Sequence, residues 1–139
     1  MHHDDITIGE EVATLEFTDV DPANMKIVSA VMGDPNPIHY DERAVDRMGH
    51  PGLINQGPIN MGYGTQAALA VAESPLGIES MEFRFEDNVY EGEDVTAVAE
   101  ATDTYVEDGQ SFADLEVRLE KTDGTVPVTG TATVRTEND

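Results

Sequence analysis

The sequence predicts an α+β domain in which a meandering antiparallel sheet wraps around one buried helix. Three observations carry this prediction. The second half of the chain alternates apolar and polar residues, the period of strands with one wet and one covered face. The first half holds capping residues and prolines at the starts of helical segments. Between them, residues 58–73 are apolar or small nearly throughout, as in a helix surrounded by other structure. A chain of 139 residues suits one domain, which we assign to residues 1–139.

The charge of the chain is strongly negative. It has 29 acidic and 7 basic residues, a formal net charge of -22. Acidic residues occur from end to end rather than in one tail. Disorder is one interpretation of such a charge, but 39% of residues are hydrophobic and fall in periodic runs, which favours a fold. A dispersed acidic surface is typical of a halophilic protein, because molar salt shortens the Debye length to about 3 Å and screens self-repulsion.

Several classes of function are excluded by composition. No basic patch is available for nucleic acid or an anionic membrane, so we expect neither as a partner. The absence of cysteine excludes thiol catalysis and thiolate metal sites. There is no signal peptide and no apolar run near the ~20 residues that span a bilayer, so we expect a soluble cytoplasmic protein. His2, His3 and the two aspartates after them are metal-ligand types, but we expect a mobile N-terminus and no metal.

The first elements are a strand and a helix. Residues 10–19 form a short strand, whose apolar residues are Val12, Leu15 and Phe17. A helix then begins at Pro22, with Asp21 as its N-cap, and ends at Gly33, which suits the left-handed C-terminal position. Its apolar stripe consists of Ile27, Val28, Val31 and Met32.

Two more helices follow. Asp41 caps a short helix that runs to about Met48, with Ala44, Val45 and Met48 on one face. After a loop rich in glycine and proline, Pro58 opens the long third helix. Gly62 and Gly64 lower its helix propensity, which makes sense if another backbone or a ligand approaches there.

The second half of the chain contains four strands. They lie within residues 80–90, 93–108, 113–121 and 126–136. Their covered faces carry Met81, Phe83 and Phe85; Val95, Ala97 and Ala99; Ala113, Leu115, Val117 and Leu119; and Val126, Val128, Ala132 and Val134. Turn sequences rich in glycine and acidic residues separate the runs.

The stretch "GDPNPIHYDE", residues 33–42, places an acid and a base near each other. Pro35 and Pro37 push the residues before them out of the helical region, so this backbone is stiff and non-helical. A compact turn would let Asp34 and His39 hold one water molecule as a general acid–base pair. The alternative is an ordinary turn, in which Asp34 caps a backbone N–H and His39 is structural.

Gly57 is a second candidate, because it directly precedes Pro58 at the start of the long helix. The first N–H groups of a helix have no internal acceptor, and the helix dipole is positive there. An oxygen that gains negative charge would be stabilised at this point, as in an oxyanion hole. The alternative is a loop glycine without a functional role.

The combined pattern resembles a known signature. The segment "VMGDPNPIHYDERAVDRMGHPGLINQGPINMGYGTQAAL" is similar to that of the MaoC-like dehydratases, more narrowly the (R)-specific enoyl-CoA hydratases. Their motif is Gly-Asp-x-Asn-Pro-apolar-His-x-Asp, followed by an x-Gly that opens the central helix. The matching positions are Gly33, Asp34, Asn36, Pro37, His39 and Asp41. Looser similarity extends over nearly the whole chain, including "FRFEDNVYEGEDV" and "VTGTATV".

The resemblance implies a hot-dog fold, usually dimeric, and the reversible syn addition of water to a trans-2-enoyl-CoA. It implies that Asp34 takes a proton from water and that His39 orients the water and delivers a proton to C2. Asn36 belongs to the motif around them, and the Gly57 N–H would hold the thioester oxygen. An acyl-CoA substrate and a homodimer are implied, with no metal or redox cofactor. The acyl chains would be short or medium, serving polyhydroxyalkanoate synthesis or fatty-acid metabolism.

The chain departs from the family pattern at Gln56, where the family commonly has histidine. Glutamine can donate a hydrogen bond but cannot titrate, so we expect a binding or supporting role. Tyr63 could line the acyl pocket, although we favour a place in the core. Two alternatives are an acyl-CoA thioesterase of the same fold and a non-catalytic acyl-CoA-binding accessory subunit. Asp34 and His39 are both retained, which disfavours the latter.

If the acidic surface is an adaptation to salt, the melting temperature should rise between low and molar KCl, because screening weakens the repulsion among carboxylates. Thermal unfolding followed by circular dichroism measures this directly. An unchanged or falling melting temperature would contradict the halophilic interpretation.

Overall fold

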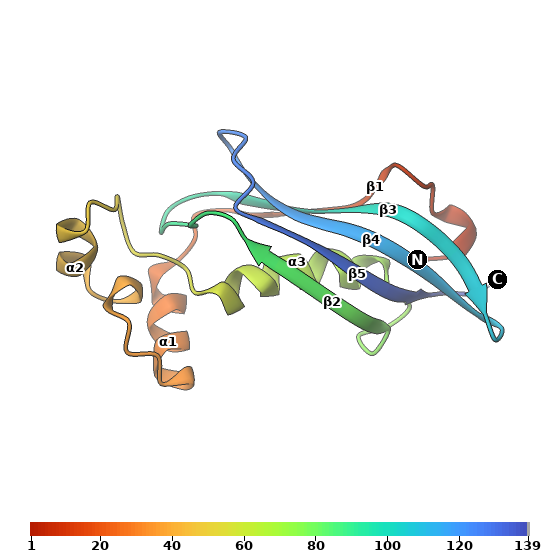
Figure 1. The fold of residues 1–139 in the computed structure, drawn as a ribbon, viewed down its shortest axis with the longest axis horizontal. Helices are drawn as coiled ribbons and strands as arrows, with labels where there is room; N and C mark the ends of the chain where they lie inside the picture. The colour runs from red at the N-terminus through yellow and green to blue at the C-terminus, as the bar shows by residue number, and fades with distance from the viewer. Residues whose placement is uncertain (139) are drawn as a thin grey trace.

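A computed structural model describes residues 1–138 and contains a five-stranded sheet with its helices (Figure 1). The elements are η1 (His3–Asp5), β1 (Glu11–Phe17), α1 (Pro22–Met32), η2 (Pro37–His39), α2 (Glu42–Arg47), α3 (Gly57–Val71), β2 (Ile78–Phe85), β3 (Val95–Glu107), β4 (Gln110–Lys121) and β5 (Val128–Thr136). The α+β hot-dog prediction is confirmed: α3 packs against all five strands, while α1 and α2 lie beyond one end of the sheet (Figure 1).

The strand order is β1-β3-β4-β5-β2, and every pair is antiparallel. β3, β4 and β5 form the predicted meander. The prediction is wrong for β2, which pairs with β5 at the far edge and leaves β1 to pair with β3. The reason is α3, which crosses the face of the sheet and returns the chain at the β5 edge. The connection of residues 86–94 then leads back to β3.

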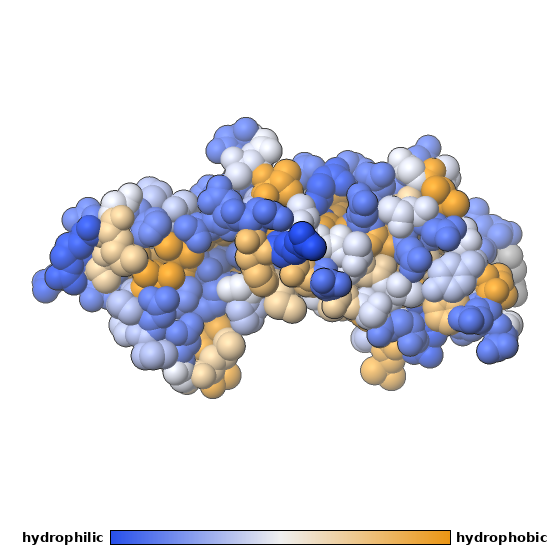
Figure 2. Space-filling view, viewed as in Figure 1, coloured by the Kyte–Doolittle hydropathy of each residue, from blue (hydrophilic) through white to orange (hydrophobic). Residues whose placement is uncertain are grey.

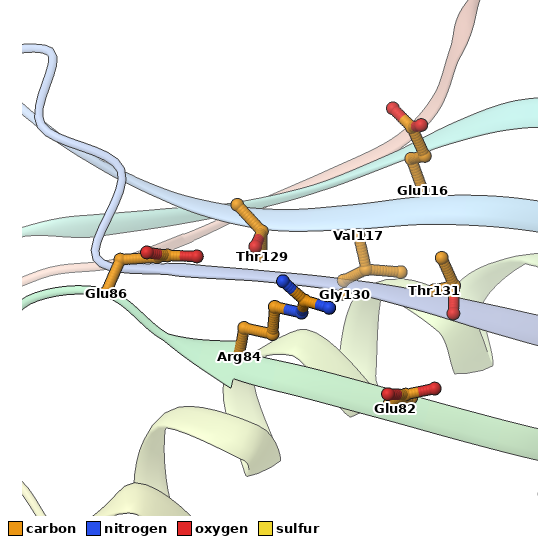
Figure 3. A pocket seen from close by; sticks show the side chains of 8 residues that line it. All are labelled: Glu82, Arg84, Glu86, Glu116, Val117, Thr129, Gly130 and Thr131. Carbon is orange, nitrogen blue, oxygen red and sulfur yellow. The ribbon is translucent and has the colours of Figure 1, made fainter.

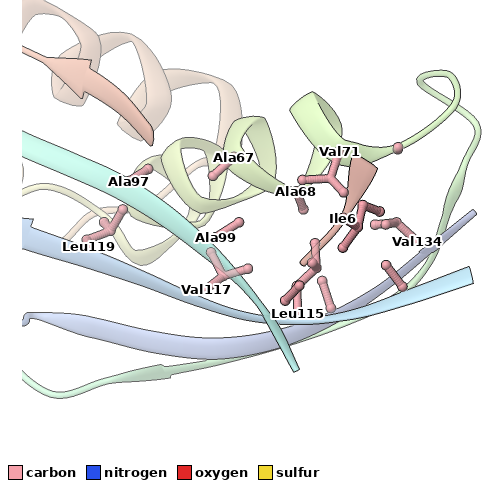
Figure 4. Packing of buried hydrophobic residues seen from close by; sticks show 14 of the residues in the cluster. Ile6, Ala67, Ala68, Val71, Ala97, Ala99, Leu115, Val117, Leu119 and Val134 are labelled. Carbon is pink, nitrogen blue, oxygen red and sulfur yellow. The ribbon is translucent and has the colours of Figure 1, made fainter. Parts of the chain in front are cut away.

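The main core lies between α3 and the sheet (Figure 4). The helix contributes small residues, Ala67 and Ala68, together with Val71. The strands contribute alternate residues as predicted: Ala97, Ala99, Leu115, Val117, Leu119, Val128, Ala132 and Val134. Small side chains on the helix let it approach the sheet closely and bury the strand side chains almost completely. Val126 is wrong as a strand residue, because β5 begins at Val128.

Some residues of two predicted apolar faces, on α1 and α2, are exposed instead of buried. The stripe on α1 is exposed at Ile27, Val31 and Met32, while Met25 and Ser29 face inward. α1 lies beyond the sheet, so its inward face is set by η2 and the start of α3 rather than by its own periodicity. Figure 2 shows hydrophobic patches at this helical end, on a largely hydrophilic face. On α2, Ala44 and Val45 are buried, but Met48 lies past the helix end and is exposed.

The helix α3 is buried on one side only, whereas the composition predicted burial nearly all round. Met61, Gly62, Gln66 and Ala70 are exposed in the single chain. Within residues 1–138, no helix is long and apolar enough to cross a membrane.

The N-terminus is held in place, which contradicts the predicted mobility. The N–H of His3 donates to the Glu137 carbonyl at 3.1 Å, and His2 Nε2 lies 3.1 Å from the Glu137 carboxylate. These contacts fasten the first residues to the C-terminal end of β5.

Gly64 confirms the close approach predicted for a glycine in the long helix. A Cβ on Gly64 would lie 2.7 Å from the Phe83 ring and 3.3 Å from Val117. Within residues 1–138, no atom beyond the neighbouring residues and the backbone of the same helix lies within 4 Å of the corresponding point on Gly62.

The substitution Gly64→Ala should lower the free energy of unfolding by about 1–2 kcal/mol, because overpacking outweighs the gain in helix propensity. Denaturant unfolding measures the loss. The control is the same substitution in a Phe83→Leu background, where a smaller side chain replaces the clashing ring and the penalty should shrink. Equal stability of Gly64→Ala and the unchanged protein would contradict this packing.

Candidate active site

The loop that carries the acid and the base is defined by local hydrogen bonds at both ends. Gly33 ends α1 in the left-handed region with φ 64°, and the N–H of Asp34 donates to the Ser29 carbonyl at 2.9 Å. At the other end, the Asp41 carboxylate accepts from the N–H groups of Arg43 and Ala44 and so caps α2. Both caps were predicted from the sequence.

Asp34 uses its two carboxylate oxygens differently. Oδ1 accepts a hydrogen bond from the N–H of Asn36 at 3.0 Å. Oδ2 lies 3.4 Å from His39 Nε2. The Asp34 side chain is 30% exposed, whereas that of His39 is 9% exposed. The turn therefore brings the predicted acid and base together and leaves one carboxylate oxygen open to solvent and to the imidazole.

His39 is oriented from the opposite side by the backbone of Ile54. His39 Nδ1 lies 2.6 Å from the Ile54 carbonyl oxygen, and the N–H of Ile54 donates to the Ile38 carbonyl at 3.0 Å. A carbonyl can only accept, so Nδ1 must carry the proton of this bond. Nε2 is then the nitrogen that faces Asp34.

This arrangement supports two protonation states. In neutral His39, Nε2 is an acceptor opposite an acceptor carboxylate, and a water molecule with two O–H donors suits the pair. In protonated His39, Nε2–H donates to Asp34 and the two form an ion pair. A proton can therefore be held at either residue, which is what general acid–base chemistry requires.

Asn36 supports the pair without facing it. Its side-chain oxygen accepts from the N–H of Ile38 at 3.3 Å and caps η2, the short helix that ends at His39. Tyr40 adds a second restraint, since its hydroxyl donates to the Pro35 carbonyl at 2.8 Å. Sequence reasoning did not single out Tyr40 or Ile54, because their bonds depend on how the loop folds back.

Gly57 is the first residue of α3, one residue before the predicted start at Pro58, and α3 has 15 residues. Its N–H has no acceptor in the part of the chain that the structure describes. The space of its missing Cβ is occupied by the ring of Phe85, 3.2 Å away. Phe85 was predicted on the covered face of its strand, yet it is 51% exposed at the start of the helix. The site thus combines a free N–H with an accessible aromatic surface.

Gln56 is buried and faces α1. Its Nε2 donates to the Met25 carbonyl at 2.7 Å and to Ser29 Oγ at 2.9 Å. Its Oε1 and the Oδ1 of the neighbouring Asn55 are buried without a partner among residues 1–138. Gln56 therefore supports the site by joining α1 to the start of α3.

Tyr63 is partly buried and packs against both core clusters. Its ring packs against Phe17 with centroids 4.4 Å apart. Burial raises the pKa of the Tyr63 hydroxyl, against a smaller lowering by a hydrogen bond from Asn55. The phenol thus keeps its proton at neutral pH.

Surface hollows occur elsewhere on the chain. One lies on the face of the sheet opposite α3 and is lined by Glu82, Arg84, Glu86, Glu116, Val117, Thr129, Gly130 and Thr131 (Figure 3). Its three glutamates surround the one arginine. A second is lined by Lys26, Tyr40, Asp41, Glu42 and Arg43, next to η2. Within residues 1–138, no group of three or more histidine or carboxylate side chains could hold a metal ion.

Comparisons with known proteins identify the family of the chain and its fold. The family model described as "MaoC like domain" matches residues 5–125. No curated protein sequence is a significant match.

Solved structures resemble the whole chain. The R-hydratase PhaJ1 from Pseudomonas aeruginosa has a TM-score of 0.84 and 19% identity, covering 99% of this chain and 86% of that one. The (R)-hydratase from A. caviae involved in PHA biosynthesis has a TM-score of 0.73 and 23% identity, with coverages of 95% and 98%. The ChsH1-ChsH2 complex from Mycobacterium tuberculosis has a TM-score of 0.75 and 21% identity, with coverages of 94% and 98%. At these identities the likeness shows the fold.

The substitution Gln56→Leu should lower the free energy of unfolding by about 1–2 kcal/mol, because two buried hydrogen bonds are lost while one unpartnered oxygen is removed. Ser29→Ala removes one of the two acceptors and should cost about half as much. Denaturant unfolding of both variants measures the two losses of stability and shows which one is larger. Full stability of Gln56→Leu would contradict the supporting role.

Proposed function

The chain belongs to the family of MaoC-like domains, and we propose that it hydrates trans-2-enoyl-CoA reversibly to (R)-3-hydroxyacyl-CoA, with short or medium acyl chains. The observation that carries this proposal is the 3.4 Å approach of Asp34 Oδ2 to His39 Nε2. One carboxylate and one imidazole on the same side of a bound substrate are what the addition of water to a double bond needs.

The proton steps follow from the two protonation states. The reaction begins with Asp34 ionised and His39 protonated. Asp34 takes a proton from water while the water oxygen bonds to C3, and His39 gives its Nε2 proton to C2. Asp34 is then protonated and His39 neutral, so a transfer between the two restores the starting state. Hydroxyl and hydrogen reach the same face of the double bond, because both groups lie on one side of it.

The thioester oxygen gains negative charge as C3 is attacked. We assign the Gly57 N–H to this oxygen, since it lies at the positive end of a 15-residue helix and has no acceptor within residues 1–138. Phe85 covers the same helix start and offers an apolar surface to the substrate beside the thioester. Hydration requires no metal or redox cofactor in this scheme.

A homodimer forms part of the proposal. The exposed face of α3 includes Met61 and Gly62, and β2 is an open edge of the sheet. The glycine costs helix propensity without a close neighbour in its own chain, which is explained if a second subunit packs there.

Purified protein in molar KCl should hydrate crotonyl-CoA, with loss of the enoyl-thioester absorbance and (R)-3-hydroxybutyryl-CoA as the product. Asp34→Asn and His39→Gln should each lower kcat at least ~100-fold, on the usual scale of general acid–base groups.

The matched controls are Asp46→Asn and His50→Gln, which change the same residue types on and just after α2 and should retain activity. A near-normal rate from Asp34→Asn or His39→Gln would overturn their roles. Release of free CoA without hydration would instead identify a thioesterase.

A further inference from the structure

The negative charge of the chain is distributed unevenly. Residues 22–72, which include all three α-helices and the candidate site, contain four acidic and three basic residues. The rest of the chain contains 25 acidic and four basic residues. The helical segment is thus nearly neutral, while the sheet and its loops carry almost the whole net charge. Residues 86–94, which hold five acidic residues, pack against residues 53–55, so this neutrality describes the helical segment itself and not all of its surroundings.

The basic residues of the sheet and of the helical segment differ in whether they form ion pairs. Three of the four basic residues of the sheet, Arg118, Lys121 and Arg135, each pair with one or more glutamates, so their charge is compensated. The fourth, Arg84, forms no ion pair within residues 1–138 but shares its hollow with three glutamates. Lys26, Arg43 and Arg47 of the helical segment form no ion pair within residues 1–138. In a chain with four acidic residues for each basic one, cations without partners are available to an external anion.

Two of these cations share one hollow. Lys26 from α1 and Arg43 from α2 line it together with Tyr40, Asp41 and Glu42. The Asp41 carboxylate already accepts hydrogen bonds from two backbone N–H groups, which stabilise part of its negative charge. Glu42 is exposed and can turn away. The hollow around Arg84 differs, because three glutamates line it and would repel an anion (Figure 3).

The hollow adjoins the catalytic loop. Tyr40 directly follows His39, and its hydroxyl bonds to the carbonyl of Pro35, next to Asp34. A ligand anchored in the hollow would therefore have its other end within reach of the acid–base pair.

We propose that Lys26 and Arg43 bind the phosphate groups of the CoA thioester, with the pantetheine arm leading from this hollow to Asp34 and His39. This inference rests on the proposed function. Guanidinium and ammonium groups are the usual protein donors to phosphate, and Arg43 offers a planar fork. The site would explain how a strongly acidic protein binds a polyanionic substrate.

The test is the double variant Lys26→Gln with Arg43→Gln, assayed at the lowest KCl in which circular dichroism shows the fold intact, because salt screens this contact. Its KM for crotonyl-CoA should rise about tenfold or more with little change in kcat, on the scale of charge-assisted hydrogen bonds. Its KM for crotonyl-pantetheine, which lacks the phosphates, should not change. Crotonyl-phosphopantetheine separates the phosphate next to pantetheine from those of the nucleotide.

Arg84→Gln is the matched control. Arg84 forms no ion pair within residues 1–138 and lies on the face of the sheet opposite α3, so its removal should leave KM unchanged. Calorimetric titration of free CoA gives a readout that does not need turnover, and the double variant should bind it about tenfold more weakly. Equal CoA binding by the double variant and the unchanged protein would overturn the phosphate site, even if hydration is observed. Weaker binding without hydration in any form would support the site and contradict the hydratase.

Discussion

The site depends on the pair of hydrogen bonds that join residues 38 and 39 to Ile54. One bond orients the imidazole of His39, and the other holds the backbone beside it. Together they fasten the loop after α1 to the segment that leads into α3. Without them, the loop that carries Asp34 and His39 would not be attached to the segment that precedes Gly57. A backbone carbonyl can only accept a hydrogen bond, so the imidazole nitrogen next to it must carry a proton. The other nitrogen, Nε2, then faces the carboxylate.

The Gln56 side chain attaches the start of α3 to α1. Histidine, common at this position in the family, would place a titratable ring against the Met25 carbonyl and the Ser29 hydroxyl. Glutamine makes both bonds through one amide nitrogen that is neutral at every pH. The start of α3 is then held to α1 independently of pH. The two sets of hydrogen bonds are complementary: Ile54 orients the imidazole of His39, and Gln56 holds the start of α3 against α1.

The sequence predicted those parts of the fold that depend on neighbouring residues. Caps at Asp21 and Asp41, the left-handed Gly33 and the alternation in β4 follow from local rules, and the structure confirms them. The two prolines predicted a stiff turn in which Asp34 and His39 could meet, while an ordinary turn with a structural histidine remained the alternative. The position of β2 beside β5, the inward face of α1 and the Ile54 carbonyl could not be predicted in this way. Each is decided by packing between segments far apart in the chain, which periodicity does not contain.

The uneven charge connects the surface of the protein with its chemistry. Most acidic residues lie on the sheet and its loops, and the fields of the more distant carboxylates are weakened at the helical end by distance and by salt. The acidic residues of the 86–94 connection are the exception, since that loop packs against residues 53–55. A formal net charge of -22 is therefore compatible with the anionic thioester that we propose as the substrate. If the acidic residues were spread evenly over the surface, each carboxylate near the site would need a nearby cation to offset its repulsion of an anion. Because residues 22–72 hold only four of the 29 acidic residues, salt changes the electrostatic potential of the sheet more than that of the segment with Asp34, His39 and Gly57.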